Sequence, residues 1–138
     1  AYTRGPMPIP DAWTMADIDR LLARGDLADL IEVPIAITNL GTPDAHWSES
    51  VCLTLAEHEH PDVRANAVLG LGHLARVAGS LSRSRSLPVI SRALIDPHPG
   101  VRAHALSAAE DVYQFLGWPE LGPDPLAGAS TPCRATNS

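Results

Sequence analysis

Histidine and acidic side chains gather at two points of this chain, and these residue types suit a metal ion. His58, Glu59 and His60 follow one another directly, and His98 comes shortly after Asp96. A zinc site needs about three or four such ligands converging at roughly 2 Å from the ion. His60 and His98 each precede a proline, which is favoured at the first position of a helix. We therefore predict that these histidines are helix caps and turn residues, with neither a metal ion nor another cofactor bound.

A second group of reactive residue types lies within one predicted helix. His104, Ser107 and Asp111 are spaced by three and four residues, which puts them on one helix face. Neighbouring side chains of one helix rarely reach the geometry in which a base activates the nucleophile and a third group orients the base. The chain also has no glycine-rich phosphate loop, because Gly70-Leu71-Gly72 falls inside a helical pattern. We predict no catalytic residues and no enzymatic activity.

The sequence elements that position these residues occur in two copies. Residues 60–68 (HPDVRANAV) recur as residues 98–106 (HPGVRAHAL), an offset of 38 residues. In each copy an apolar stripe of period 3.6 continues to Gly79 or Gly117, which predicts a helix that ends at a glycine. A shorter apolar stripe precedes each copy, so the repeat unit reads as two helices. Self-similarity at a period of tens of residues is the mark of a stacked helical array.

A more divergent first unit precedes these two. Thr14 and Asp17 predict a capping box for a helix over 15–24, and Gly25 ends it. The next helix carries Pro34 in its middle, where a proline removes a hydrogen bond. The predicted helix pairs span 11–41, 43–79 and 87–117, with a solvated loop over 80–86. We expect residues 1–118 to form one domain, followed by an irregular Pro-rich tail over 119–138 for which Trp118 and Leu121 are the candidate anchors.

The repeated motif indicates a family. Its Pro-Asp-Val-Arg-x-x-Ala at 61–67 and Pro-Gly-Val-Arg-x-x-Ala at 99–105 resemble HEAT repeats and their bacterial HEAT-like relatives, over 43–117 clearly and over 11–41 weakly. The resemblance implies an all-α, right-handed α-solenoid of about three helix pairs. It also implies a ladder of acids and arginines between neighbouring repeats, which gives Asp62, Arg64 and Arg102 a structural role. Gly100 replaces the acid in the last copy.

Some HEAT-like proteins are enzymes, and this sequence lacks the residues that mark two of these enzyme types. Deoxyhypusine hydroxylase binds iron through His-Glu pairs directly after the repeat arginine, where this chain has Ala65-Asn66 and Ala103-His104. HEAT-like DNA glycosylases use a basic concave face with aromatic residues, which this chain lacks. A HEAT-like phycobilin lyase stays open, although nothing marks a chromophore site.

Charge is divided unevenly along the chain. Residues 1–62 carry eleven acidic residues against three arginines, whereas residues 63–102 carry six arginines against Asp96 alone. An acidic half repels nucleic acid and attracts a basic protein, although an ordinary solvated surface is the alternative. We expect no membrane span, since no run of about 18 apolar residues occurs. Without a secretory leader pattern, and with Cys52 and Cys133 making no disulfide framework, we expect a cytoplasmic protein.

These observations predict a non-catalytic protein-binding module. The docking residues that we expect are acidic residues of the first half and polar residues on the second helix of each pair: Asp26, Asp29, Glu32, Asp44, Glu49, Glu57, Glu59, Asn66, His73, His104 and Asp111. Ile31 and Ile35 belong to the same predicted strip. The expected partner is a basic, nuclease-like toxin domain, which would make this chain an immunity protein. A scaffold or regulatory adaptor is the alternative, and a HEAT-like lyase or metal-dependent hydroxylase is the alternative of another class.

Overall fold

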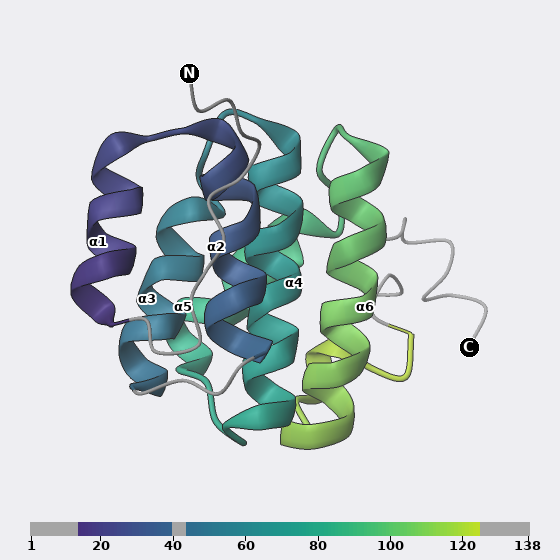
Figure 1. Ribbon diagram of the computed structural model, residues 1–138. Coiled ribbons are helices and arrows are strands. Elements are labelled where there is room, and N and C mark those ends of the chain that lie inside the picture. The colour runs from purple at the N-terminus through teal and green to yellow at the C-terminus, as the bar shows by residue number, and fades with distance from the viewer. Residues whose placement is uncertain (1–13, 40–43, 125–138) are drawn as a thin grey trace.

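The computed structural model describes residues 14–39 and 44–124, and this part of the chain is all-α. It contains six α-helices and a short 3-10 helix, and no strand occurs within these residues (Figure 1). The elements are α1 (Met15–Arg24), α2 (Leu27–Asn39), α3 (Ala45–Leu55), α4 (Pro61–Val77), α5 (Arg83–Ala93), α6 (Pro99–Leu116) and η1 (Pro119–Leu121).

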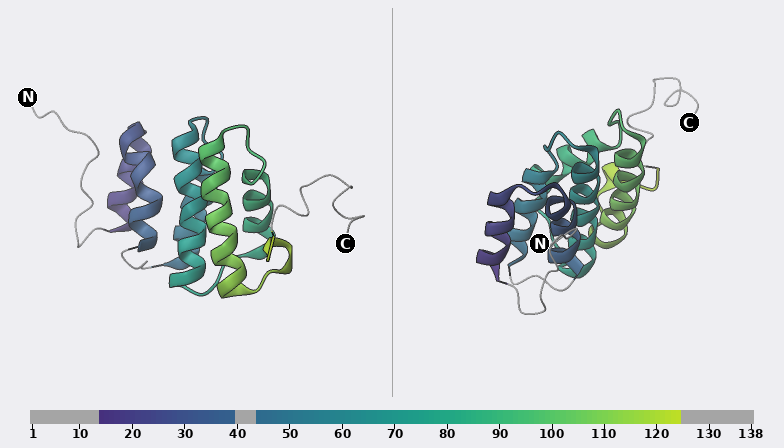
Figure 2. Two further views of the ribbon diagram at one scale, coloured as in Figure 1. Left: turned by 90° about the vertical axis from the view of Figure 1, so that its right-hand side faces the viewer. Right: turned by 45° about the horizontal axis from the view of Figure 1, so that its top comes forward.

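The helices stack as three pairs in a solenoid-like array, as the sequence predicts. The first helix of each pair packs on the second: α1 on α2, α3 on α4 and α5 on α6. The second helices form one layer, in which α4 stands between α2 and α6 (Figures 1 and 2). Because α4 also contacts α3 and α5, it is the centre of the array and its residues determine the spacing of the other helices.

Local sequence explains where the first and last helices begin and end. The Thr14 hydroxyl accepts a hydrogen bond from the Asp17 N–H at 3.1 Å, and the Asp17 carboxylate accepts one from the Thr14 N–H at 2.8 Å. This reciprocal pair confirms the predicted capping box. Gly25 (φ 69°) and Gly117 (φ 71°) end α1 and α6 in the left-handed region that suits glycine.

Small residues let the second helices approach closely. A Cβ added to Gly72 would lie 2.7 Å from the Cα of Ala108, so the backbones of α4 and α6 meet there. A Cβ on Gly70 would lie 2.9 Å from the buried Cys52 Sγ and 3.2 Å from the carbonyl oxygen of Pro34. The two glycines therefore form the contact points of α4, and the prediction that they lie in a helix and not in a phosphate loop is confirmed.

The prediction of a solvated loop over 80–86 is wrong, because α5 begins at Arg83. The first turn of this helix is held by Glu49 of α3, which accepts hydrogen bonds from the Ser82 N–H at 2.8 Å and the Ser86 hydroxyl at 2.5 Å. The Ser-Arg alternation has no apolar periodicity, so the contact with a residue more than thirty positions away decides the local structure.

Packing also extends past the predicted domain boundary at residue 118. Trp118 and Leu121 are buried, and η1 lies against α6, in agreement with the two anchors expected at the start of the tail. Glu120 of η1 forms an ion pair with Arg83 at the start of α5. The ends of the first predicted pair and of the tail, including Cys133, lie outside the described residues.

Candidate protein-docking surface

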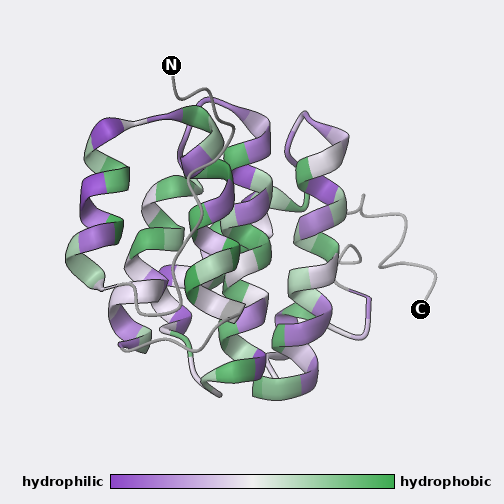
Figure 3. Ribbon diagram, viewed as in Figure 1, coloured by the Kyte–Doolittle hydropathy of each residue, from purple (hydrophilic) through white to green (hydrophobic). Residues whose placement is uncertain are grey.

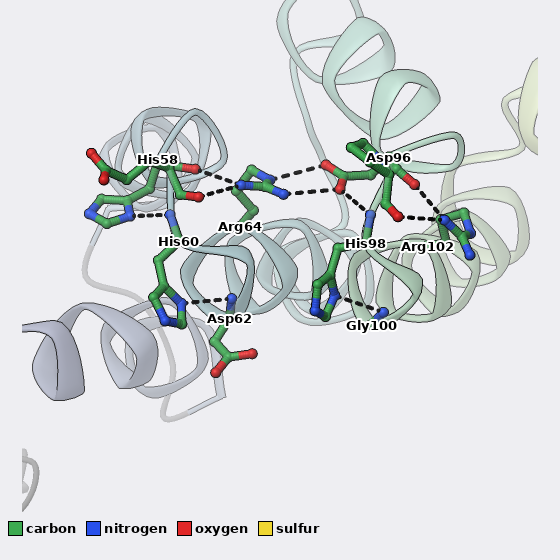
Figure 4. Close-up of polar contacts among 10 residues, drawn as sticks. His58, His60, Asp62, Arg64, Asp96, His98, Gly100 and Arg102 are labelled. Carbon is green, nitrogen blue, oxygen red and sulfur yellow. Dashed lines mark hydrogen bonds and ion pairs between the residues drawn. The ribbon is translucent and has the colours of Figure 1, made fainter.

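The repeated histidines lie at the turns that precede α4 and α6 (Figure 4). Nδ1 of His60 accepts a hydrogen bond from the Asp62 N–H, and Nδ1 of His98 accepts one from the Gly100 N–H, both at 3.1 Å. His58 accepts from the His60 N–H at 3.0 Å. The prediction that His60 and His98 cap helices is confirmed. Across 14–39 and 44–124, no group of three or more His, Cys, Asp or Glu side chains could hold a metal ion.

Arg64 ties the turn of the second pair to the turn of the third. Its Nη1 donates to the backbone carbonyls of His58 at 3.1 Å and Glu59 at 2.8 Å. Its Nε and Nη2 each donate at 3.0 Å to one carboxylate oxygen of Asp96 (Figure 4). Burial tends to raise the pKa of Asp96, but hydrogen bonds from Arg64 and the His98 N–H outweigh it and hold that pKa below its ordinary value. A planar two-bond pair of this kind fixes geometry as well as charge.

The acid of this ladder is not the one that the resemblance implies. The Asp62 side chain is exposed in the first turn of α4, and the carboxylate opposite Arg64 belongs to Asp96 in the following repeat. The position one repeat earlier than Asp96 is His58, so the two copies differ here. Comparison of the copies alone does not reveal the partner, because Asp96 has no counterpart.

Two of the predicted docking acids cannot reach a partner. Asp29 is 1% exposed, and Arg24 donates to its carboxylate at 3.1 Å. Glu49 is 4% exposed and accepts hydrogen bonds from the first turn of α5, with Arg85 at 3.3 Å. Both carboxylates are structural, because they neutralise charge and satisfy donors inside the fold.

The other predicted acids lie at the surface and differ in whether they form an ion pair, cap a helix or have no ion-pair partner among the described residues. Glu57 forms an exposed ion pair with Arg92, and Asp26 forms one with Arg24 at 3.3 Å. Asp44 caps α3 by accepting from the Trp47 N–H at 3.1 Å. Glu32 and Glu59 are exposed and form no ion pair with another described residue.

The predicted strip on the second helices is partly used to join them. Asn66 donates to the backbone carbonyl of Ile31 at 2.8 Å, and His73 lies 3.3 Å from the Thr38 hydroxyl, so both link α4 to α2. Burial and the charge of Arg76 lower the pKa of His73, against a smaller opposite effect of Asp111. The main role of Asn66 and His73 in the fold is therefore to hold α2 against α4.

On α6, the reactive residue types stay separate. His104 and Asp111 are half-buried and Ser107 is exposed. In the described part of the chain, no hydrogen bond joins any two of these three side chains. The face carries the polar surface that the sequence predicts, without the contacts of a catalytic triad.

A groove between α2 and α4 brings several of the predicted residues together. It has a volume of about 370 Å³ and is lined by Ile31, Glu32, Ile35, Ala36 and Asn66. The two isoleucines and Ala36 are half-buried, whereas Glu32 is exposed. Along α2 and α4 as a whole, hydrophobic and hydrophilic residues alternate (Figure 3). We call this site the α2–α4 groove. Sequence reasoning named most of its residues without placing them around one hollow, and it did not include Ala36.

A second hollow of about 470 Å³ lies between the turns before α4 and α6. Its walls include Val68, Val89 and the exposed Ile95, and its charged groups are mostly matched within the fold. Arg64 is paired with Asp96, and Glu57 with Arg92, which leaves the exposed Glu59 as its unmatched charge. The second hollow also contains two arginines, whereas no basic residue of the described ranges lines the α2–α4 groove, which makes the groove the better candidate for a basic partner.

Six helices in three stacked pairs, with a grooved polar and apolar surface, define the protein as an α-solenoid-like array of the kind that presents surfaces to partners. The family model described as HEAT repeat matches residues 50–78, from within α3 to the end of α4, and supports a HEAT-like repeat family. HEAT repeats are generally protein-interaction modules. No curated protein and no solved structure matches the chain. None of the helices within the described ranges has the length and apolar character needed to cross a membrane.

Proposed function

We propose that this protein is a non-catalytic binding module that receives a basic partner protein at the α2–α4 groove. The observation that carries this proposal is the exposed Glu32 carboxylate beside an apolar wall formed by Ile31 and Ile35. Among the described residues Glu32 has no ion-pair partner, so its charge is available to another molecule. An apolar hollow with an acid at its rim suits a partner segment that carries an aliphatic or aromatic residue next to a lysine or arginine.

The size of the groove is consistent with one or two inserted side chains. Its volume of about 370 Å³ is near the lower end of ligand pockets, which span roughly 300–1,000 Å³. Apolar contact contributes about 25 cal/mol for each Å² removed from water, so the inserted side chain supplies most of the affinity. The acid at the rim acts mainly on the association rate and on the choice of partner.

The partner that we propose is a basic toxin domain of the nuclease type, so that this protein acts as its immunity protein. A nuclease needs a positive surface because its substrate carries a dense row of phosphates. An acidic module that covers such a surface competes directly with the substrate. The acidic first half of the chain and the Glu32 rim support this assignment.

The test uses the protein encoded beside this gene, if that neighbour carries a basic toxin domain. Binding is measured by calorimetry for the wild type, Glu32→Arg and Asp19→Arg. Asp19 is an exposed acid on α1 outside the groove, so both variants change the net charge equally. We expect Glu32→Arg to weaken binding by about tenfold or more and Asp19→Arg by less than about twofold.

The outcomes separate the parts of the proposal. No binding to the neighbouring toxin domain overturns the immunity assignment. Binding that both variants weaken equally shows a general electrostatic attraction and refutes the groove. Binding that does not weaken between about 50 and 300 mM salt contradicts the role of charge in either place.

A further inference from the structure

Arg102 repeats the geometry of Arg64 but lacks its acid. Nη1 of Arg102 donates to the backbone carbonyls of Asp96 at 2.7 Å and Pro97 at 3.1 Å. Nη1 of Arg64 bonds in the same way to the carbonyls of His58 and Glu59, one repeat earlier. The Nε and Nη2 groups of Arg64 then hold Asp96, whereas no described residue accepts from the same two groups of Arg102 (Figure 4).

The position of the Arg102 guanidinium is therefore fixed before any acid arrives. Two backbone carbonyls hold one edge of the planar group, and the other edge is the fork that binds carboxylates through two parallel hydrogen bonds. Asp96, whose own backbone carbonyl holds Arg102, cannot supply this bond, because its carboxylate already accepts from Arg64 and from the His98 N–H at 2.9 Å. Arg102 is exposed, whereas the Arg64 side chain is only 20% exposed.

We propose that Arg102 is a docking point for an aspartate or glutamate on a turn of a partner protein, which takes the place that Asp96 takes at Arg64. This contact has the opposite sign from the one proposed at Glu32 and involves α6 in place of α2. It does not depend on the function proposed for the α2–α4 groove.

The exposed face of α6 indicates that the partner presents its aspartate or glutamate on a turn and does not pack a helix pair closely against α6. In the 38-residue register, Gly72 of α4 corresponds to Glu110 of α6. Gly72 lets the backbone of α6 approach, whereas Glu110 places an exposed side chain at the same point. Tyr113, 40% exposed, stands in the position of the buried Ala75. A helix cannot approach α6 here as closely as α6 approaches α4, but a turn can reach Arg102 at the start of α6.

The test measures carboxylate binding at individual arginines in the folded protein. The probe is an acetylated, amidated peptide with the sequence of residues 93–99 (ALIDPHP), whose aspartate is the acid that binds Arg64. It is titrated into ¹⁵N-labelled protein while the arginine Nε–Hε signals are followed by NMR. We expect the Arg102 signal to saturate at a concentration at least about fivefold below that of Arg76, an exposed arginine in the last turn of α4. The Arg64 signal should not respond, because its fork is occupied.

Two controls make the outcome decisive. A peptide with Asn in place of the Asp should leave the Arg102 signal unchanged. In the variant Asp96→Ala the Arg64 fork is vacated, and Arg64 should gain the response that Arg102 shows in the wild type. The proposal is overturned if Arg102 and Arg76 respond alike in the wild type, or if both peptides give the same shifts. The variant Glu32→Arg should keep the Arg102 response, so failure at one site is distinguishable from failure at the other.

Discussion

The contact between α4 and α6 makes a specific prediction for Gly72. A Cβ at this position would lie 2.7 Å from the Cα of Ala108, 3.1 Å from its Cβ and 3.4 Å from its carbonyl oxygen. Two of these three atoms belong to the backbone of α6, so rotation of a side chain cannot relieve the contact. The variant Gly72→Ala must push the helices apart, and α4 is the helix against which the rest of the array packs.

The sign of the effect follows from two opposed contributions. Replacing glycine by alanine inside a helix usually stabilises it by about 1 kcal/mol. Inserting a methyl group into a tight interface costs about 1–3 kcal/mol, and the backbone contact at Gly72 puts the cost at the upper end. We expect Gly72→Ala to lower the free energy of unfolding by about 1–2 kcal/mol.

Equilibrium urea unfolding measures this difference, with Gly100→Ala as the matched control. Gly100 also lies in a helix, but an added Cβ would meet only the ring of the exposed His98 at 3.2 Å, and a shift of a few tenths of an ångström relieves this contact while the ring keeps its hydrogen bond from the Gly100 N–H. We expect Gly100→Ala to be neutral or slightly stabilising. The reasoning is refuted if Gly72→Ala is stabilised as much as Gly100→Ala. Adding Ala108→Gly should rescue the variant only in part, because the 2.7 Å contact with the Cα remains.

Three further predictions concern buried polar groups. The pKa of Asp96 is lowered in the folded protein, so its stabilising effect is complete above the unfolded pKa of about 3.8 and is lost as the pH falls through the folded pKa. Asp96→Asn should therefore lower the free energy of unfolding, measured in urea, by about 2 kcal/mol at pH 7 and by progressively less below pH 3.8. Glu49→Gln should cost about 2 kcal/mol because the acceptor of α5 is weakened, whereas Glu32→Gln should stay within about 0.5 kcal/mol; equal costs would contradict the burial argument. Burial and the Glu49 charge raise the pKa of the Cys52 thiol, so in a Cys133→Ser background a thiol reagent at pH 8 should label Cys52 only as fast as the protein unfolds, and rapid labelling in native buffer would show that this thiol is accessible.

The architecture could be predicted because it is repeated in the sequence. The stripe over 60–79 occurs again over 98–117, and prolines and glycines at fixed offsets mark the helix ends. Residues 80–86 show the limit of this approach. Their serines and arginines carry no periodicity, and Glu49 in α3 provides the contact that makes them helical. A residue more than thirty positions away cannot be identified from a local pattern.

The sequence predicts which residue types lie in the candidate docking surface, but it does not predict whether each of them is buried or exposed. Asp29 and Glu49 look like surface acids in the sequence, and both are buried in the fold. The prediction failed because a buried carboxylate is stabilised by an arginine or serine that packs against it. That partner is brought to the carboxylate only by the fold, so the local sequence does not distinguish a buried acid from an exposed one. The residues of the α2–α4 groove were easier to predict from the sequence, because Ile31, Ile35 and Asn66 follow the helix period of the predicted strip.

The acidic and basic segments are separate in the sequence, but ion pairs bring some of their charges together in the folded protein. Arg85 and Arg92 of α5 reach back to Glu49 and Glu57 of α3, so arginines of the basic segment neutralise acids of the acidic half. A partner is therefore attracted less by the number of acids than by the few charges that the fold leaves unmatched. Glu32 is such a charge on α2, and Arg102 is another, of opposite sign, on α6. A partner that engages both must carry a basic and an acidic group at matching positions, and this requirement discriminates between partners more strongly than net charge does.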